Sequence, residues 1–212
     1  MNLDTYLVTA ERLSAGRSTV EIVEAAIEAG IDVVQLREKE MSARDRYDLG
    51  RRLRELTRAA DVPLIVNDRI DLAAAVDADG VHLGDEDLPV AVARERLGEA
   101  AVVGRSVSTP EAAREAERAG ADYLGVGAVY PTDSKDTDPE GTEIGLDRIA
   151  AVAEAVGIPV VGIGGVKPDN AAAVIEAGAD GVAVISAITT ADDPAAATRE
   201  LRAAVERGRA DA

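Results

Sequence analysis

The chain has 212 residues, a formal net charge of −17 and no cysteine. This length fits one domain of barrel size better than two, and the negative charge argues against nucleic acid or an anionic membrane as a partner, because both bind basic faces. Without cysteine the chain has no disulfide, no thiolate nucleophile and no sulfur-bound metal.

The basic residues are mostly arginine. Of the 23 basic residues, lysine contributes only Lys39, Lys135 and Lys167. An excess of acidic residues with so little lysine is typical of adaptation to high salt, where screening removes the repulsion between like charges. We therefore expect a halophilic protein that molar salt stabilises.

The N-terminal stretch 1–10 carries Asp4 inside a short apolar run and has no basic leader before a long apolar segment. It predicts neither a signal peptide nor a membrane span. The lack of cysteine suits a reducing compartment, so we expect a cytoplasmic protein.

Apolar runs alternate with helical stretches along the whole chain. Eight runs are predicted to be strands: 5–9, 33–37, 64–67, 80–83, 102–107, 123–128, 160–163 and 181–185. Strands that alternate with helices predict a parallel sheet, and small β-branched residues suit strands covered on both faces. Residues 1–212 are therefore predicted to form a single (β/α)8 TIM barrel.

Signals for helix ends stand between these runs. Ser18 followed by Glu21 predicts a capping box at a helix start. Proline loses no hydrogen bond as a first helical residue, which is predicted at Pro110, Pro168 and Pro194. Left-handed residues are predicted to end helices at Gly30, Gly98, Gly120, Gly157 and Gly178.

A short unit recurs where a helix leads into a strand. Its copies are Glu28-Ala-Gly-Ile-Asp32, Arg118-Ala-Gly-Ala-Asp122 and Glu176-Ala-Gly-Ala-Asp180, with Val76-Asp-Ala-Asp79 as a looser one. Repetition of a βα unit is typical of such a barrel. The polar stretch 130–145 interrupts the pattern and is predicted to be a long functional loop.

Polar or glycine-rich segments follow seven of the predicted strands, and the active site of such a barrel lies at the carboxyl ends of its strands. In chain order the segments are Gln35-Leu-Arg37-Glu-Lys39, Asn67-Asp68, Asp85-Glu86-Asp87, Arg105-Ser106, Pro131-Thr132-Asp133-Ser134-Lys135, Gly162-Ile-Gly164-Gly165 and Ser186. We predict that these segments meet at one rim.

Each segment also has an ordinary structural explanation. Alternating polar residues fit a solvated strand end, Asn-Asp fits a turn, Asp87 fits a helix cap, and a glycine run fits a tight turn. The lone His82 lies inside a predicted strand, where packing or a hydrogen bond is the expected role rather than catalysis.

The combination of segments favours phosphate chemistry. Two carboxylates that converge from neighbouring strands, Asp68 and Asp87, favour Mg²⁺, which binds one or two carboxylates plus phosphate oxygens and water. The glycine run with Ser186 favours a phosphate site. With no Ser-His or Cys-His pair evident, the site favours departure of a phosphorylated group, and two phosphate positions predict two phosphorylated substrates.

The segments resemble, in order, the motifs of the thiamine-phosphate synthase family. The matching motifs are Gln35-Leu-Arg-Glu-Lys39, Ile65-Val-Asn-Asp68, Gly80-Val-His-Leu-Gly84 with Asp87, Pro131-Thr-Asp-Ser-Lys135, Gly162-Ile-Gly-Gly165 and Val184-Ile-Ser-Ala-Ile188. The resemblance covers essentially the whole chain and implies a Mg²⁺-dependent transferase that joins a pyrimidine diphosphate to a thiazole phosphate. The implied mechanism is dissociative: pyrophosphate leaves, and the neutral thiazole nitrogen captures the pyrimidine methyl cation without a base.

The resemblance also implies the roles of single residues. The pyrimidine diphosphate would be bound by Gln35, Arg37, Lys39 and Asn67, with Leu36 and Glu38 in the same segment, and Mg²⁺ by Asp68 and Asp87. Ser106 would contact the pyrimidine and Lys135 the pyrophosphate. The thiazole phosphate would be bound by Thr132 and Ser134, with Asp133 of the same segment as a further substrate-binding residue. Its phosphate group would be bound by Gly164, Ile185 and Ser186. Catalysis is assigned to Arg37, Lys39, Lys135 and Ser106. Ser134 stands where the family usually has a second Thr.

Three alternatives compete with this interpretation. A thiazole tautomerase-like isomerase on the same fold needs neither the metal pair nor the diphosphate cations. A non-catalytic phosphate-ligand-binding barrel has no use for them, and an isomerase of a single-phosphate sugar or of the tryptophan pathway has no reason for the metal pair. The sequence leaves the oligomeric state open, a homo-oligomer included.

Overall fold

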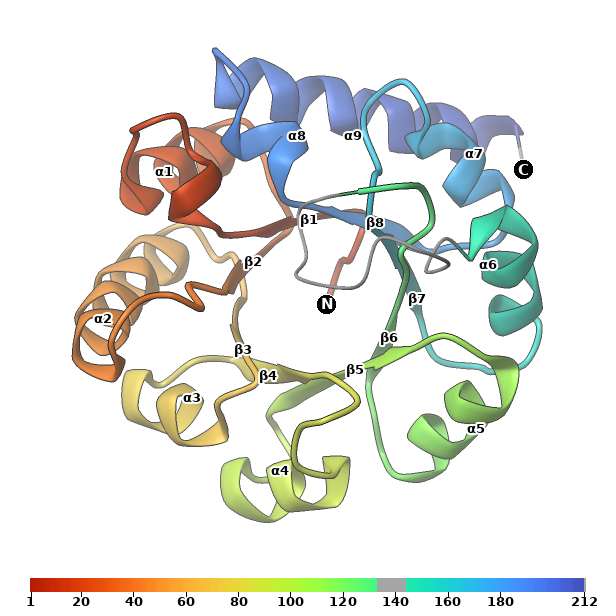
Figure 1. The fold of residues 1–212 in the computed structure, drawn as a ribbon, viewed down its shortest axis with the longest axis horizontal. Helices are drawn as coiled ribbons and strands as arrows, with labels where there is room; N and C mark the ends of the chain where they lie inside the picture. The colour runs from red at the N-terminus through yellow and green to blue at the C-terminus, as the bar shows by residue number, and fades with distance from the viewer. Residues whose placement is uncertain (133–143, 212) are drawn as a thin grey trace.

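A computed structural model describes residues 1–132 and 144–211 and shows a closed barrel of eight parallel strands inside a ring of helices (Figure 1). The strands are β1 (Thr5–Val8), β2 (Val33–Leu36), β3 (Leu64–Asn67), β4 (Gly80–Leu83), β5 (Val102–Val107), β6 (Tyr123–Val126), β7 (Val160–Ile163) and β8 (Gly181–Val184). Each strand pairs with the next in the chain, and β8 pairs with β1. The predicted (β/α)8 barrel is confirmed.

The helices cover the outer face of the sheet. They are η1 (Glu11–Leu13), α1 (Thr19–Glu28), α2 (Ala43–Ala59), α3 (Ile70–Val76), α4 (Val90–Leu97), α5 (Pro110–Arg118), α6 (Gly145–Ala153), α7 (Ala171–Glu176), α8 (Ser186–Thr189) and α9 (Pro194–Asp211). Within the described ranges, no helix combines the length and the apolar character needed to cross a membrane.

The sequence placed the strands more accurately than the helix ends. Every predicted strand start is confirmed, as are the Ser18 capping box and the helix starts at Pro110 and Pro194. Pro168 was wrong as a helix start, because Asn170 bonds back to Lys167 N–H at 2.7 Å and α7 begins only after that turn. Gly157 was wrong as a helix end, because α6 stops at Ala153.

The recurring unit fastens strands together in pairs at the amino-terminal end of the barrel. The aspartate before each of four even-numbered strands accepts a hydrogen bond from a backbone N–H of the preceding strand: Asp32 from Thr5 (3.1 Å), Asp79 from Leu64 (2.8 Å), Asp122 from Val103 (2.6 Å) and Asp180 from Val160 (2.8 Å). Arginines from the helices pair with three of these carboxylates, at Asp32, Asp79 and Asp122. The repeat therefore has a structural role.

The core has two layers, because successive side chains of a strand point to opposite faces of the sheet. Leu7, Val34 and Val66 belong to the larger cluster that packs against the helices. Tyr6, Val8, Tyr123 and their neighbours form the smaller cluster, and they point into the barrel. The smaller cluster therefore lies inside the barrel, enclosed by the strands.

One glycine in β8 lies against neighbouring backbone, and we expect Gly181→Ala to destabilise the fold by about 3 kcal/mol or more. An added Cβ would overlap the carbonyl oxygen of Leu3, which cannot move without shifting β1. Urea unfolding in molar KCl measures the loss. Gly157→Ala is the control, since its Cβ would lie 3.4 Å from the Glu117 side chain, an ordinary contact. Equal stability of the two variants would contradict the prediction.

Candidate active site

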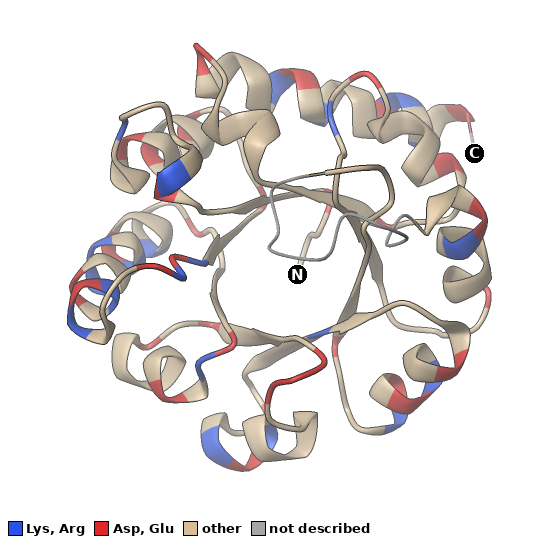
Figure 2. Cartoon of the chain, in the orientation of Figure 1, with Lys and Arg blue, Asp and Glu red and all other residues tan. Residues whose placement is uncertain are grey.

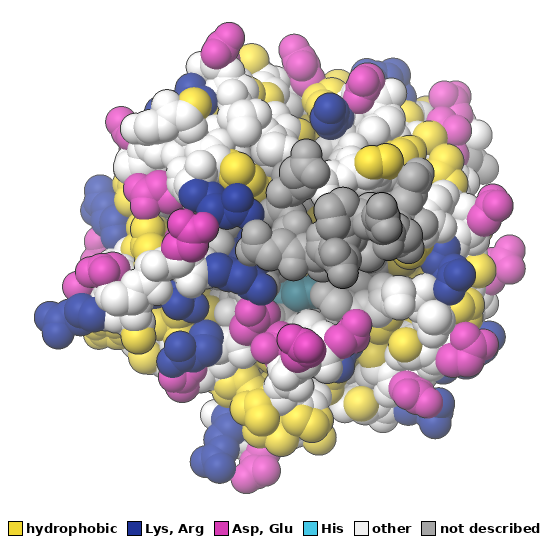
Figure 3. All heavy atoms as spheres, in the orientation of Figure 1, with side chains coloured by type: hydrophobic (Ala, Val, Ile, Leu, Met, Phe, Trp, Pro, Cys, Tyr) yellow, Lys and Arg dark blue, Asp and Glu magenta, His cyan; other side chains and the backbone are white. Residues whose placement is uncertain are grey.

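A cavity of about 850 Å³ opens at the carboxyl ends of the strands. Its polar lining comes from at least six strands or their following loops and includes Tyr6, Gln35, Arg37, Lys39, Asn67, Asp68, His82, Asp87, Ser106 and Tyr123. Figure 3 shows basic and acidic side chains side by side at this mouth. The structure thus brings most of the predicted rim residues of β2 to β5 together, and the exceptions are Leu36, Glu38 and Arg105.

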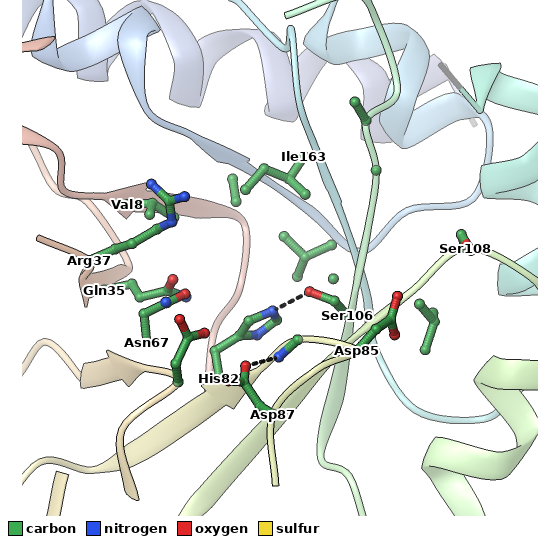
Figure 4. Close-up of a pocket in the computed structure, with 18 of the residues that line it drawn as sticks. Val8, Gln35, Arg37, Asn67, His82, Asp85, Asp87, Ser106, Ser108 and Ile163 are labelled. Atoms are coloured by element: carbon green, nitrogen blue, oxygen red, sulfur yellow. Dashed lines mark hydrogen bonds between the residues drawn. The ribbon is translucent and has the colours of Figure 1, made fainter. Parts of the chain in front are cut away.

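Two side chains from the end of β2 point into the cavity (Figure 4). Gln35 is 4% exposed and donates its amide N–H to the hydroxyl of Tyr6 at 2.8 Å. Arg37 is 7% exposed, and its backbone N–H donates to Thr9 Oγ1 at 3.0 Å. The strand ends at Leu36, one residue before the predicted end at residue 37, and Lys39 reaches the cavity from the following loop.

The side chains of Leu36 and Glu38 are turned away from this cavity. Leu36 packs in the outer core between the sheet and the helices. The Glu38 carboxylate accepts hydrogen bonds from Glu11 N–H and Thr19 Oγ1, both at 2.8 Å. These side chains hold the segment in place, and only their backbone remains a candidate for the predicted substrate contact.

The two predicted metal ligands lie next to each other on the acidic side of the mouth. Asp68 has a left-handed backbone (φ 63°), and its N–H donates to the carbonyl of His82 at 2.8 Å. Asp87 accepts from Gly84 N–H at 2.6 Å (Figure 4). Burial raises the pKa of Asp68, the adjacent Asp87 raises it further, and Lys39 and Arg37 lower it in part.

This donor set fits a hard divalent cation. Two carboxylates that approach each other repel when both are ionised, and a divalent cation removes that repulsion. In the described part of the chain no group of three or more His, Cys, Asp or Glu residues forms a complete metal cage. A pair of carboxylates open to a cavity is the arrangement that Mg²⁺ uses when phosphate oxygens and water complete its coordination.

The floor of the cavity is a polar network. His82 lies between Tyr123 and Ser106, with Nδ1 3.0 Å from the Tyr123 hydroxyl and Nε2 3.0 Å from Ser106 Oγ. The predicted hydrogen bonding of His82 within the barrel is confirmed. Ser106 lies across the cavity from Gln35 and Arg37 in Figure 4.

A second, smaller cavity adjoins the first and shares Ile163 and Ala183 with it. Its lining gathers the four described residues predicted to bind the thiazole phosphate, which are Thr132, Gly164, Ile185 and Ser186. Gly164 and Gly165 have φ of 95° and 66°, conformations that favour glycine. The cavity itself is small, with a volume of about 20 Å³.

Three predicted residues, Asp133, Ser134 and Lys135, lie outside the described residues, and their placement stays a prediction. Sequence reasoning missed three others that line the main cavity, Tyr6, Tyr123 and Arg148. The two tyrosines resembled ordinary core residues of strands. The sequence does carry a signal for them. The hydroxyl of a tyrosine whose side chain points into the barrel needs a hydrogen-bond partner when it is buried.

The barrel is closed, cations and a carboxylate pair line its mouth, and a glycine-rich cavity lies beside that mouth. These features together define a phosphate-handling (β/α)8 enzyme. The family model described as "Thiamine monophosphate synthase" matches residues 5–188. The chain therefore belongs to the thiamine monophosphate synthase family, and the prediction of a transferase of this family is confirmed.

Individual relatives agree over nearly the full length. The chain is 73% identical to "Thiamine-phosphate synthase" of Natronomonas pharaonis, over 95% of this chain and 94% of the relative. It is 68% identical to the protein of that name from Haloarcula marismortui, over 97% and 98%. A solved structure, "Thiamine phosphate pyrophosphorylase from Pyrococcus furiosus", matches with a TM-score of 0.88 and 46% identity, over 98% of this chain and 97% of that one.

Proposed function

We propose that this enzyme joins a pyrimidine methyl diphosphate to a thiazole phosphate and releases pyrophosphate. The carbon–oxygen bond between the pyrimidine methylene and the diphosphate breaks, and a carbon–nitrogen bond from that methylene to the thiazole nitrogen forms. The observation that supports this reaction is the convergence of Arg37, Lys39, Asp68 and Asp87 on one cavity beside the glycine-lined one. Both the tautomerase and the ligand-binding alternatives leave that charged set without a use.

The chain's own groups suit a dissociative substitution. Arg37 and Lys39 offer positive charge where negative charge develops on the departing diphosphate. The thiazole nitrogen is neutral and carries a lone pair, so it captures the methylene carbon without a general base. Asn67 lies on the same side of the cavity as Arg37 (Figure 4) and adds a neutral hydrogen-bonding group there.

Asp68 and Asp87 would hold Mg²⁺ in this site. When bound, the cation supplies positive charge to the diphosphate oxygens. Lys39 Nζ lies 3.8 Å from Asp68 Oδ2, so the carboxylate pair and the lysine are positioned to act on one phosphate group. The metal and the cationic residues together would neutralise the leaving group from two sides.

The test of this function supplies both phosphorylated substrates and Mg²⁺ to the purified protein in molar KCl. We expect thiamine phosphate and pyrophosphate in equal amounts. Omission of the thiazole phosphate separates the synthase from a simple diphosphatase, since pyrophosphate release should then be far slower. A folded protein that forms no thiamine phosphate would refute the proposal.

We further propose that the enzyme is adapted to high salt, and we expect its melting temperature to rise by about 10 °C or more, or roughly 3 kcal/mol, between dilute buffer and molar KCl. The net charge is −17, and acidic residues lie on the outer helices all around the barrel (Figure 2). Salt screens their repulsion. Relatives from Natronomonas, Haloarcula and Haloquadratum support the proposal. An uncharged osmolyte is the control, and a melting temperature independent of KCl would contradict the proposed salt adaptation.

A cytoplasmic location remains an expectation from composition.

A further inference from the structure

Five side chains form a continuous hydrogen-bonded chain across the inside of the barrel, from β2 to β5. Gln35 Nε2 lies 2.8 Å from the Tyr6 hydroxyl, which lies 2.9 Å from the Tyr123 hydroxyl. Tyr123 lies 3.0 Å from His82 Nδ1, and His82 Nε2 lies 3.0 Å from Ser106 Oγ. All five residues line the main cavity. We call this chain the relay.

One arrangement of protons gives every hydroxyl of the relay both a donor and an acceptor. Burial raises the pKa of both Tyr6 and Tyr123, so each phenol keeps its single proton at neutral pH. In this arrangement Tyr6 accepts from the Gln35 amide and donates to Tyr123, and Tyr123 donates to Nδ1 of His82. A neutral imidazole that accepts at Nδ1 carries its proton on Nε2, so it donates to Ser106 Oγ.

The backbone of β5 and β6 leaves space for the rings of the relay. A Cβ at Gly125 would lie 2.9 Å from His82 Cε1, and a Cβ at Gly104 would overlap the ring of Tyr123. The ring centroids of Tyr6 and Tyr123 lie 6.0 Å apart, and those of His82 and Tyr123 lie 5.5 Å apart. The ring of Tyr123 is thus packed against the rings of both Tyr6 and His82. This packing holds each hydroxyl or ring nitrogen close to its hydrogen-bond partner in the relay.

We propose that His82, held by Tyr123 and Tyr6, is a positioning residue that fixes Ser106 as a hydrogen-bond donor to the pyrimidine ring of the diphosphate substrate. This inference rests on the proposed function. Because Ser106 accepts from His82, its own hydroxyl proton is directed to an acceptor in the cavity, for which a ring nitrogen of the pyrimidine is suited. The relay also fixes the side chain of Gln35. One hydrogen-bonded network therefore positions both Gln35 and Ser106, which lie on two sides of the pyrimidine site.

The first test reads the relay without catalysis. His82 is the only histidine of the chain, so ¹⁵N-labelled imidazole gives one set of NMR signals with no assignment problem. We expect the proton on Nε2 and a bare Nδ1 in the wild-type protein, and a loss of this preference in Tyr123→Phe, which keeps the ring and removes only the hydroxyl. A proton on Nδ1 in the wild type would reverse the relay and overturn the proposal.

The second test uses kinetics. We expect His82→Leu to lower kcat/KM for the pyrimidine diphosphate about a hundredfold. Misplacement of a binding group by about 1 Å causes a loss of this size. The KM for the thiazole phosphate should be unchanged. His82→Gln, which keeps an N–H donor, should recover most of the loss. In a Ser106→Ala background, His82→Leu should have little further effect, because His82 acts through Ser106.

The outcomes separate this inference from the proposed function. Equal losses toward both substrates, or full additivity of the His82 and Ser106 substitutions, would assign His82 a merely structural role. A wild-type protein that makes no thiamine phosphate would sink the proposed function, while the NMR result would still decide the direction of the relay. Should His82→Leu fail to fold, Tyr123→Phe carries the same kinetic comparison with a smaller change.

Discussion

Arg37→Ala should lower kcat by a factor of about 10² to 10³, the loss found when one donor to a developing negative charge is removed. Arg37 lies at the mouth of the barrel, 7% exposed, on the side opposite Ser106 (Figure 4). Its guanidinium offers two parallel N–H donors to a phosphate, so Arg37→Lys should recover only part of the activity. Steady-state kinetics with both substrates saturating measure the effect.

Loss of fold must be separated from loss of charge in this experiment. The backbone bond from Arg37 to Thr9 does not involve the side chain. Replacement of the side chain keeps this bond, and the melting temperature of Arg37→Ala shows whether the variant stays folded at the assay temperature. Arg44→Ala is the control, since Arg44 is exposed on α2 and pairs only at the surface with Asp48. Turnover of Arg37→Ala within twofold of the control would show that the diphosphate lies elsewhere.

The carboxylate pair gives the second large effect. Asp68→Asn and Asp87→Asn should each weaken divalent cation binding by a factor of about 10 to 100 or more, because even the loss of an outer partner of a metal ligand costs that much. The side-chain oxygen of asparagine can still accept from Gly84 N–H at position 87, so the loop should keep its shape. Turnover should then need correspondingly more Mg²⁺.

Binding is measured apart from activity by following free Mn²⁺ with electron paramagnetic resonance in the presence of inorganic pyrophosphate. Asp71→Asn is the matched control, because Asp71 is exposed and pairs with Arg69 outside the cavity. Chelation of all divalent cations should abolish product formation by the wild type, and added Mg²⁺ should restore it. Unchanged Mn²⁺ affinity in both variants would show that Asp68 and Asp87 do not bind the metal.

Much of the fold was readable because its signals are local. Each strand begins at the residue where the sequence predicted it, because burial on both faces makes the strands stand out as largely apolar runs. The helix signals at Ser18, Pro110 and Pro194 act through bonds within one turn and were right. Pro168 was misread because Lys167 N–H donates to the Asn170 side chain, a local turn that delays the start of α7. Gly157 was misread because its N–H donates to Glu117, which lies 40 residues away in the sequence.

The site was readable in part for the same reason. Parallel strands end at one rim, so the polar residues that follow them had to gather there, and Arg37, Asn67, Asp68, Asp87 and Ser106 do line one cavity. Alternation along β2 suggested the inward direction of Gln35 and Arg37. It could not show that the chain leaves the strand after Leu36 and turns Glu38 back to Thr19.

By itself, then, the sequence determined the barrel, its strand order and the set of groups at its mouth, because periodicity and strand ends are properties of neighbouring residues. Only the tertiary structure decided which partners those groups have. Tyr6 and Tyr123 are separated by 117 residues and meet at 2.9 Å because closure of the sheet brings β1 and β6 across one interior. Hydrogen bonds of this kind depend on distances that no local pattern of residues encodes.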